Sequence, residues 1–232
     1  MFIDMKLARI SITIVLLLVS ATLFAQGIYL QRGQNGFGAE ARVIWNEEGF
    51  GATDVTAGYS IAGILDIGAG LTYTLGDLDG FSSSDLRIAF DYRVNVLKQS
   101  PGVPLSIQVM GSYGLNEVNS DYLDGPPAVI RRGKGYTIGL DLSRNFRLSR
   151  FLLLHLNTLV DYESISYTER EESIPDVITN EERIRNLYYG GGGGFLFVFP
   201  KGQTLAIRAE VRADEDLKLH IQPIVGIAFP QN

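Results

Sequence analysis

The sequence predicts an all-β protein: a closed, antiparallel, up-and-down transmembrane β-barrel of about ten strands, with eight strands as the alternative. Three observations predict this fold. Apolar and polar residues alternate over long segments, the links between segments are short on one side and longer on the other, and aromatic residues gather near segment ends. A tilted strand needs about 9–11 residues to cross a bilayer, and several segments reach that length.

The N-terminal residues form a separate unit. Lys6 and Arg9 precede a short apolar run over residues 10–19, and small residues follow it up to Ala25. A positive start, a short apolar run and a small residue before the cut are typical of a secretory signal peptide. The run is too short for a membrane-spanning helix, which needs about 20 apolar residues. We therefore expect residues 1–25 to be a signal peptide cleaved after Ala25, with an uncleaved anchor as the alternative, and residues 26–232 to form one barrel domain.

The period of two recurs in ten segments after the signal peptide. They span residues 35–46, 53–62, 64–75, 84–97, 103–115, 134–146, 150–167, 184–199, 203–213 and 216–229. The fourth segment is the clearest, because Leu86, Ile88 and Phe90 alternate with Arg87 and Asp91. In the eighth segment, five consecutive glycines leave the two faces undefined. An even number of strands returns the C-terminus to the side on which the barrel began.

The links between segments differ in length on the two sides. The link after each even-numbered segment is short, whereas three links after odd-numbered segments are longer and polar, at residues 76–83, 116–133 and 168–183. Short turns on one side and longer loops on the other are typical of outer-membrane barrels.

The charged residues of the segments fall opposite the apolar face. A Lys or Arg at the bilayer midplane costs about 2–4 kcal/mol on a lipid-facing surface, so we expect the charged face to line the lumen. Buried charges of both signs are costly unless they pair. The expected lumen network consists of Arg87, Asp91, Arg93, Asp141, Arg144, Asp161, Glu163, Arg208, Glu210 and Arg212.

Aromatic residues near the strand ends are expected to form two girdles at the depth of the lipid headgroups. The girdle residues are Trp45, Tyr73, Tyr113, Tyr136 and Tyr162 near one set of ends, and Phe151, Phe199 and Phe229 near the other. Tyr167 and Tyr188 are assigned to the first of these two groups.

With these residues, the chain resembles the small, porin-like outer-membrane β-barrel proteins of diderm (Gram-negative) bacteria over essentially all of residues 27–229. The closing segment IQPIVGIAF is similar to their C-terminal assembly signal, except that three residues follow Phe229. The resemblance is to the class and to no specific family, and it implies a fold and a location in the outer membrane of the cell envelope.

Composition and motifs argue against several kinds of chemistry. The chain has no cysteine and only two histidines, His155 and His220, so we expect no metal site and no cofactor. Barrel proteases resemble one another in an Asp-x-Asp pair facing an Asp-x-His pair, and Asp77-Leu78-Asp79 supplies only the first. Barrel lipases share a His-x-Ser motif, whereas Asn157 and Gln222 stand two residues after the two histidines. We expect no catalytic residues, and interpret His155 as a hydrogen-bonded lumen residue.

Two function classes remain open from the sequence. The first is a structural or surface-interaction role through loops 116–133 and 168–183, and the second is a narrow pore for ions or small solutes. A soluble lipocalin-like periplasmic binding barrel is a more distant alternative. The expected partners are outer-membrane lipid and lipopolysaccharide, and, during biogenesis, the barrel-assembly machinery and periplasmic chaperones. We expect a monomer that binds no nucleic acid, since the net charge is −6.

Overall fold

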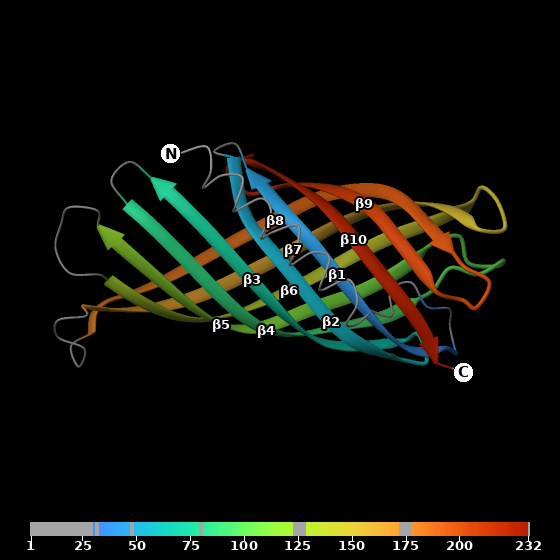
Figure 1. The fold of residues 1–232 in the computed structure, drawn as a ribbon, viewed down its shortest axis with the longest axis horizontal. Coiled ribbons are helices and arrows are strands. Elements are labelled where there is room, and N and C mark those ends of the chain that lie inside the picture. The colour runs from blue at the N-terminus through green and yellow to red at the C-terminus, as the bar shows by residue number, and fades with distance from the viewer. Residues whose placement is uncertain are drawn as a thin grey trace, which may run out of the picture.

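Ten antiparallel strands form a closed barrel, as the sequence predicts (Figure 1). The structure, a computed structural model, describes Leu30 and residues 33–46, 49–78, 81–122, 129–171 and 178–231. The signal peptide expected at residues 1–25 lies outside these residues. The strands are β1 (Asn35–Asn46), β2 (Gly49–Ile61), β3 (Leu65–Leu78), β4 (Phe81–Leu97), β5 (Ser106–Tyr122), β6 (Val129–Arg147), β7 (Leu152–Glu171), β8 (Ile178–Val198), β9 (Thr204–Ala213) and β10 (Leu219–Gln231).

Each strand pairs with its neighbours along the chain, and β1 closes the barrel by pairing with β10. Closure leaves no strand edge with unpaired backbone groups. The even-numbered strands finish at one end, which we call the turn end, and the odd-numbered strands finish at the opposite end, which we call the loop end. The turn end lies at the right of Figure 1 and includes the C-terminus.

The turn between β2 and β3 shows how the short connections are made. Ala62 and Gly63 both have positive φ, 53° and 59°, and the N–H of Ile64 donates to the carbonyl oxygen of Ile61 at 2.9 Å. Positive φ at both central residues defines the two-residue turn whose twist matches that of the flanking strands. The turn therefore fixes the register of β2 against β3.

Three strand pairs extend further than predicted. The sequence predicts loops at 76–83, 116–133 and 168–183, but β5 continues to Tyr122 and β7 to Glu171. β6 and β8 begin correspondingly early, and β3 and β4 leave only residues 79–80 between them. The alternation of apolar residues fades in these extensions because neither face needs to be apolar there, while backbone pairing continues unchanged. Loss of the pattern was therefore wrongly interpreted as loss of the strand.

The strands differ in length around the barrel. β7 and β8 have 20 and 21 residues, whereas β9 has 10 and β1 has 12. The loop end is therefore oblique: β4 to β8 extend further to the left of Figure 1 than β9, β10, β1 and β2. The short strands lie at the seam where the barrel closes, and the long ones form a wall opposite it.

The two faces of the sheet have opposite chemistry. On β9, Ile207 and Val211 face outward and are 50% and 44% exposed, whereas Arg208 and Glu210 face the lumen and are 5% and 4% exposed. The interior is polar, and its one cluster of buried apolar side chains among the described residues joins Leu30 to Ala228. In the described part of the chain, no helix is long and apolar enough to cross a membrane.

Candidate functional site

The centre of the lumen holds a group of ion pairs that joins the first and last strands. Arg208 on β9 contacts Glu40 on β1, with 2.9 Å between Nη2 and Oε2, and its Nη1 lies 3.3 Å from Oε1 of Glu210. The side chains of Arg208 and Glu40 are only 3% and 2% exposed. We call Glu40, Arg208 and Glu210 the seam clamp, because the contact spans β10, which lies between β9 and β1. A bidentate arginine is well suited to bridge two carboxylates at fixed spacing.

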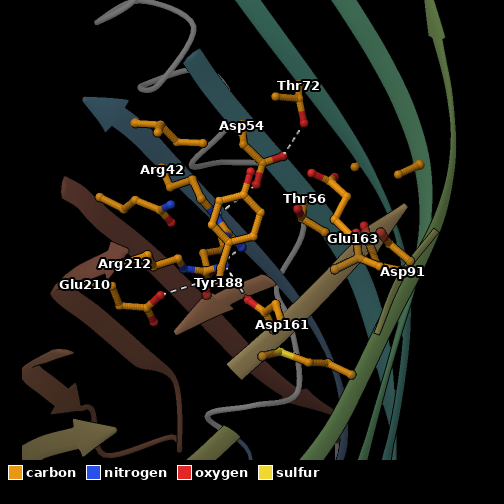
Figure 2. Close-up of a pocket in the computed structure, with 18 of the residues that line it drawn as sticks. Arg42, Asp54, Thr56, Thr72, Asp91, Asp161, Glu163, Tyr188, Glu210 and Arg212 are labelled. Carbon is orange, nitrogen blue, oxygen red and sulfur yellow. Dashed lines mark hydrogen bonds and ion pairs between the residues drawn. The ribbon is translucent and has the colours of Figure 1, made fainter. Parts of the chain in front are cut away.

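A second layer of ion pairs lies next to the clamp, on its loop-end side (Figure 2). Arg212 contacts Asp161 at 2.6 Å and Glu210 at 3.0 Å. Arg42 contacts Asp54 at 2.9 Å and Glu40 at 3.1 Å. These two arginines extend the clamp to β7 and β2, so one connected network joins strands on several sides of the lumen.

A separate pair bridges the opposite wall. Nη1 of Arg87 on β4 lies 2.7 Å from Oε1 of Glu163 on β7, and both side chains are 16% exposed. Nη2 of Arg87 also donates to the hydroxyl of Ser112 at 3.1 Å. The pair passes across the lumen-facing side of β5 and β6, where small residues such as Gly114 leave room for the guanidinium. It is more accessible to water than the seam clamp.

The glycine run of β8 makes space for the clamp. Gly194 and Gly192 lie opposite Arg208 and Glu210 in the β8–β9 register. A Cβ built on Gly194 would lie 2.9 Å from Cγ of Arg208, and one on Gly192 would lie 2.8 Å from Cγ of Glu210. The carbonyl oxygens of Ala209 and Ile207 lie even closer to these two Cβ positions, so glycine is required here by the close approach of the β9 backbone as well as its side chains. The contacts with β9 therefore account for Gly192 and Gly194 within the run.

The lumen contains a cavity of about 520 Å³ next to the clamp. Figure 2 shows Tyr188, Asp54 and Asp161 projecting towards one another within it. Carboxylates outnumber guanidinium groups among its lining residues, which include Glu40, Asp54, Asp91, Asp141, Asp161, Glu163 and Glu210 together with Arg42, Arg87, Arg93, Arg208 and Arg212. The cavity therefore offers a polar space with an excess of formal negative charge.

Leu30 lies at the turn end of the lumen. Leu30 is 1% exposed and packs with Ala228, and its carbonyl oxygen accepts a hydrogen bond from Nζ of Lys98. Nζ of Lys98 also donates to the carbonyl of Gly63 at 3.2 Å, and the N–H of Gly33 donates to Ala62 at 2.7 Å. None of these residues lines the cavity, so Leu30 and its contacts lie on the other side of the clamp from the cavity.

The structure brings together nearly all the charged residues expected in the lumen. Nine of them line the same cavity: Arg87, Asp91, Arg93, Asp141, Asp161, Glu163, Arg208, Glu210 and Arg212. Arg144 is the exception, and its assignment to the lumen is wrong. It shares the outward face with Phe146, two residues away, and its guanidinium lies 4.6 Å from the centre of that ring. The alternation of the strand itself places Arg144 outside.

Three residues of the network were absent from the expected set. Glu40, Arg42 and Asp54 form the β1 and β2 side of the network. Glu40 and Arg42 already stand opposite the apolar face of segment 35–46, so the alternation could have identified them. Asp54 could have been found in the same way, because it lies between outward-facing Thr53 and Val55 and directly opposite Arg42 in the β1–β2 register.

The aromatic residues divide between the two faces. The eight girdle residues Trp45, Tyr73, Tyr113, Tyr136, Tyr162, Phe151, Phe199 and Phe229 lie on the outward side, and all but the partly covered Tyr162 are well exposed. Tyr167 and Tyr188 were wrongly assigned to this group. Tyr188 lines the cavity and packs edge-on against His220, while the hydroxyl of Tyr167 meets Asn116 at 3.5 Å. The glycines that follow Tyr188 hid its face in the sequence.

Of the candidate catalytic residues raised from the sequence, only the histidines have described side chains. His155 is buried, and its Nδ1 lies 2.8 Å from Oδ1 of Asn145, with no serine among its hydrogen-bond partners. The side chains of Asp77 and Asp79 lie outside the described set. Among the residues that are described, no group of three or more His, Asp or Glu side chains is arranged to hold a metal ion.

Comparison with known proteins identifies the fold. No protein-family model and no curated protein sequence matches the chain. Among solved structures, the translocator domain of the autotransporter NalP from Neisseria meningitidis is similar at a TM-score of 0.55 and 12% identity, covering 97% of each chain. The β domain of the Bordetella autotransporter BrkA is similar at a TM-score of 0.53 and 13% identity, and the match covers 84% of this chain and 99% of that one. The chain therefore has the fold of bacterial outer-membrane β-barrels.

Proposed function

We propose that this protein spans the bacterial outer membrane as a closed, non-conducting barrel with a structural or surface-interaction role. In this arrangement the loop end faces the outside of the cell, and the long wall of β4 to β8 carries the contacts with partners. The observation that carries the proposal is the reversed distribution of polarity: buried charged side chains inside, exposed apolar side chains outside.

The outward surface supports the membrane location. Exposed apolar residues occur on every strand, and include Leu71, Ile88, Leu115, Ile138, Val160, Ile207, Ile221 and Val225. Monomeric soluble proteins rarely expose a continuous apolar patch of more than a few hundred Å². Contact with lipid removes this surface from water, and closure of the sheet satisfies the backbone groups within the hydrocarbon.

The lumen supports a non-conducting barrel. The seam clamp crosses the interior, and the buried side chain of Leu30 packs against Ala228 at its turn end. An eight-stranded barrel is filled by its side chains, whereas open porins use about 16–18 strands, so a ten-stranded barrel with ion pairs across its lumen is closer to the filled kind than to an open channel. The proposal includes no catalytic step.

The membrane location is tested by extraction and gel mobility. We expect the protein to be released from envelopes only by detergent, and to migrate faster in SDS gels when unheated than when boiled, because the closed barrel resists SDS. Release in plain buffer as a stable monomer, without a change in mobility on boiling, would exclude the proposal.

A narrow pore is the second candidate function, and the cavity of about 520 Å³ favours it. A path past the clamp would admit only ions or small solutes, and the excess of carboxylates would favour cations. Planar-bilayer recording separates the two functions. We expect no discrete conductance steps from the wild type, and steps with cation preference would instead establish the pore.

The clamp provides a control for that recording. Replacing Arg208 and Glu40 together by serine removes both charges and most of the volume that crosses the lumen. If the barrel still shows heat-dependent mobility, we expect this variant to conduct more than the wild type.

A further inference from the structure

Four basic residues gather on the outward face of the long wall, towards the loop end. Arg132 and Lys134 lie on β6, and Arg183 and Arg185 lie on β8. All four are exposed. They share the lipid-facing side of the sheet with Tyr136, so their positive charge does not belong to the lumen network.

The strand register places these cations on both sides of two serines of β7, Ser164 and Ser166. Lys134 pairs with Ser166 on β7, which pairs in turn with Arg183 on β8. In the next row, Ser164 stands between Tyr136 and Arg185. Neighbouring strands are about 4.8 Å apart, so the β6 and β8 columns are separated by about 10 Å. Long basic side chains on either side of two serines can converge on a group of the size of a phosphate.

The position along the wall matches the edge of the apolar belt. The rows immediately towards the turn end pair Ile138 with Tyr162 and Leu187, and Leu140 with Val160 and Tyr189. These are apolar or aromatic side chains on the outward face. A molecule with acyl chains could lie against them while its headgroup reaches Lys134, Arg183 and Arg185.

The acidic residues near this surface leave most of its charge unneutralised. Glu117 contacts Arg132 at 3.2 Å, and Glu181 lies one row further towards the loop end, opposite Thr168. Lys134, Arg183 and Arg185 form no ion pair with another described side chain, and Nε of Arg183 donates to the hydroxyl of Ser166 at 3.1 Å. The cluster is therefore positive although the whole chain has a net charge of −6.

We propose that Lys134, Arg183 and Arg185 bind the phosphate groups of lipid A, the membrane anchor of lipopolysaccharide, in the outer leaflet. This inference rests on the proposed function, which puts the loop end outside. Guanidinium and ammonium groups are the side chains that proteins use to bind phosphate. The apolar rows of Ile138 and Leu140, next to these residues on the turn-end side, favour a phosphorylated lipid over free phosphate.

The opposite end of the same wall offers a matched control. Arg144, Arg147 and Arg150 are exposed at the turn end, and the guanidinium of Arg150 lies 4.4 Å from the ring centre of Phe151. In the proposed orientation these arginines lie at the periplasmic end of the barrel, away from the outer leaflet. Neutralising three arginines there removes the same number of charges without touching the lipid A site.

The test measures binding of bisphosphorylated lipid A to the full-length mature protein in a non-ionic detergent by native mass spectrometry. The triple variant K134Q/R183Q/R185Q should lose on the order of tenfold or more in affinity, since each basic residue near an anionic headgroup contributes substantially. R144Q/R147Q/R150Q should bind within about twofold of the wild type, as expected of side chains outside the site. Dephosphorylated lipid A and inorganic phosphate should both bind the wild type more weakly than bisphosphorylated lipid A.

Equal binding of phosphorylated and dephosphorylated lipid A would overturn the inference, as would equal losses in the two triple variants. Heat-dependent gel mobility, measured on every variant without lipopolysaccharide, reports separately on the barrel and on the proposed function. If K134Q/R183Q/R185Q lost this mobility change, the single variants K134Q and R185Q would carry the test, and normal lipid A affinity in both would overturn the inference.

Discussion

The seam clamp and the Arg87–Glu163 pair are both ion pairs across the lumen, but they lie in different surroundings. The clamp residues Arg208 and Glu40 are almost completely buried, and the clamp spans the strand at which the barrel closes. Both groups line the cavity, but the side chains of Arg87 and Glu163 are each 16% exposed. Desolvation makes an unpaired charge far more costly in the clamp. We therefore expect the seam clamp to stabilise closure of the barrel, and the Arg87–Glu163 pair to tolerate water.

Breaking the clamp should have the largest effect. Glu40→Ala leaves the almost completely buried Arg208 with one carboxylate fewer, and removing one partner of a buried pair costs about 3–5 kcal/mol. We expect a decrease of that size in the free energy of unfolding, measured by urea titration in lipid vesicles. An unchanged urea midpoint would show that the clamp does not stabilise closure.

A charge on the outward face should have the next largest effect. Ile207 is adjacent to Arg208 on β9 but points in the opposite direction, towards lipid in our account. Ile207→Arg should lower the free energy of unfolding in vesicles by about 2–4 kcal/mol if this position lies near the midplane. If the variant were instead a soluble, lipid-free protein whose free energy of unfolding equals that of the wild type, Ile207 would not face lipid, and the membrane location would be contradicted.

A Cβ in the glycine run should disturb the clamp indirectly. Gly194→Ala forces the new methyl group against β9 and Cγ of Arg208, and overpacking of this kind typically costs about 1–3 kcal/mol. Gly102→Ala is the control, because a Cβ there meets nothing within 4 Å, and its cost should stay within about 0.5 kcal/mol. Equal urea midpoints for the two variants would refute the role assigned to the run.

The Arg87–Glu163 pair should show the smallest effect. Water can solvate either partner when the other is removed. Arg87→Ala and Glu163→Ala should therefore each lower the free energy of unfolding by less than removal of Glu40 or Arg208. A double-mutant cycle should give a coupling energy of about 1 kcal/mol or less, decreasing with added salt. A coupling as large as that between Arg208 and Glu40 would remove the distinction between the two regions.

The sequence predicted the barrel because alternation is a direct consequence of having lipid on one side and a polar lumen on the other. It predicted the lumen position of Arg208, Glu210 and Arg212 for the same reason. It failed where that constraint ends: the extensions of β5 to β8 beyond the apolar belt carry polar residues on both faces. The glycine run removed the same signal around Tyr188.

Other features depend on contacts between distant segments, which the pattern of one strand does not contain. Glu40 and Arg208 are 168 residues apart, and their contact follows from the pairing of β1 with β10. The position of Leu30 across the turn end likewise depends on Lys98, which belongs to the link after β4. Alternation predicts which face a residue occupies, but not which residue it meets across the lumen.

The most direct test of the outward apolar surface uses Trp45, the single tryptophan of the chain, which is exposed near the loop end of β1. Its fluorescence is recorded in vesicles made with lipids brominated along the acyl chains, and again with acrylamide in the water. A second measurement on Trp45→Phe/Ile207→Trp moves the reporter towards the middle of β9. Strong quenching by brominated lipid at both positions, with weak quenching by acrylamide at the second, is the result our account requires. Quenching by acrylamide alone at both positions would show that the apolar face does not contact lipid.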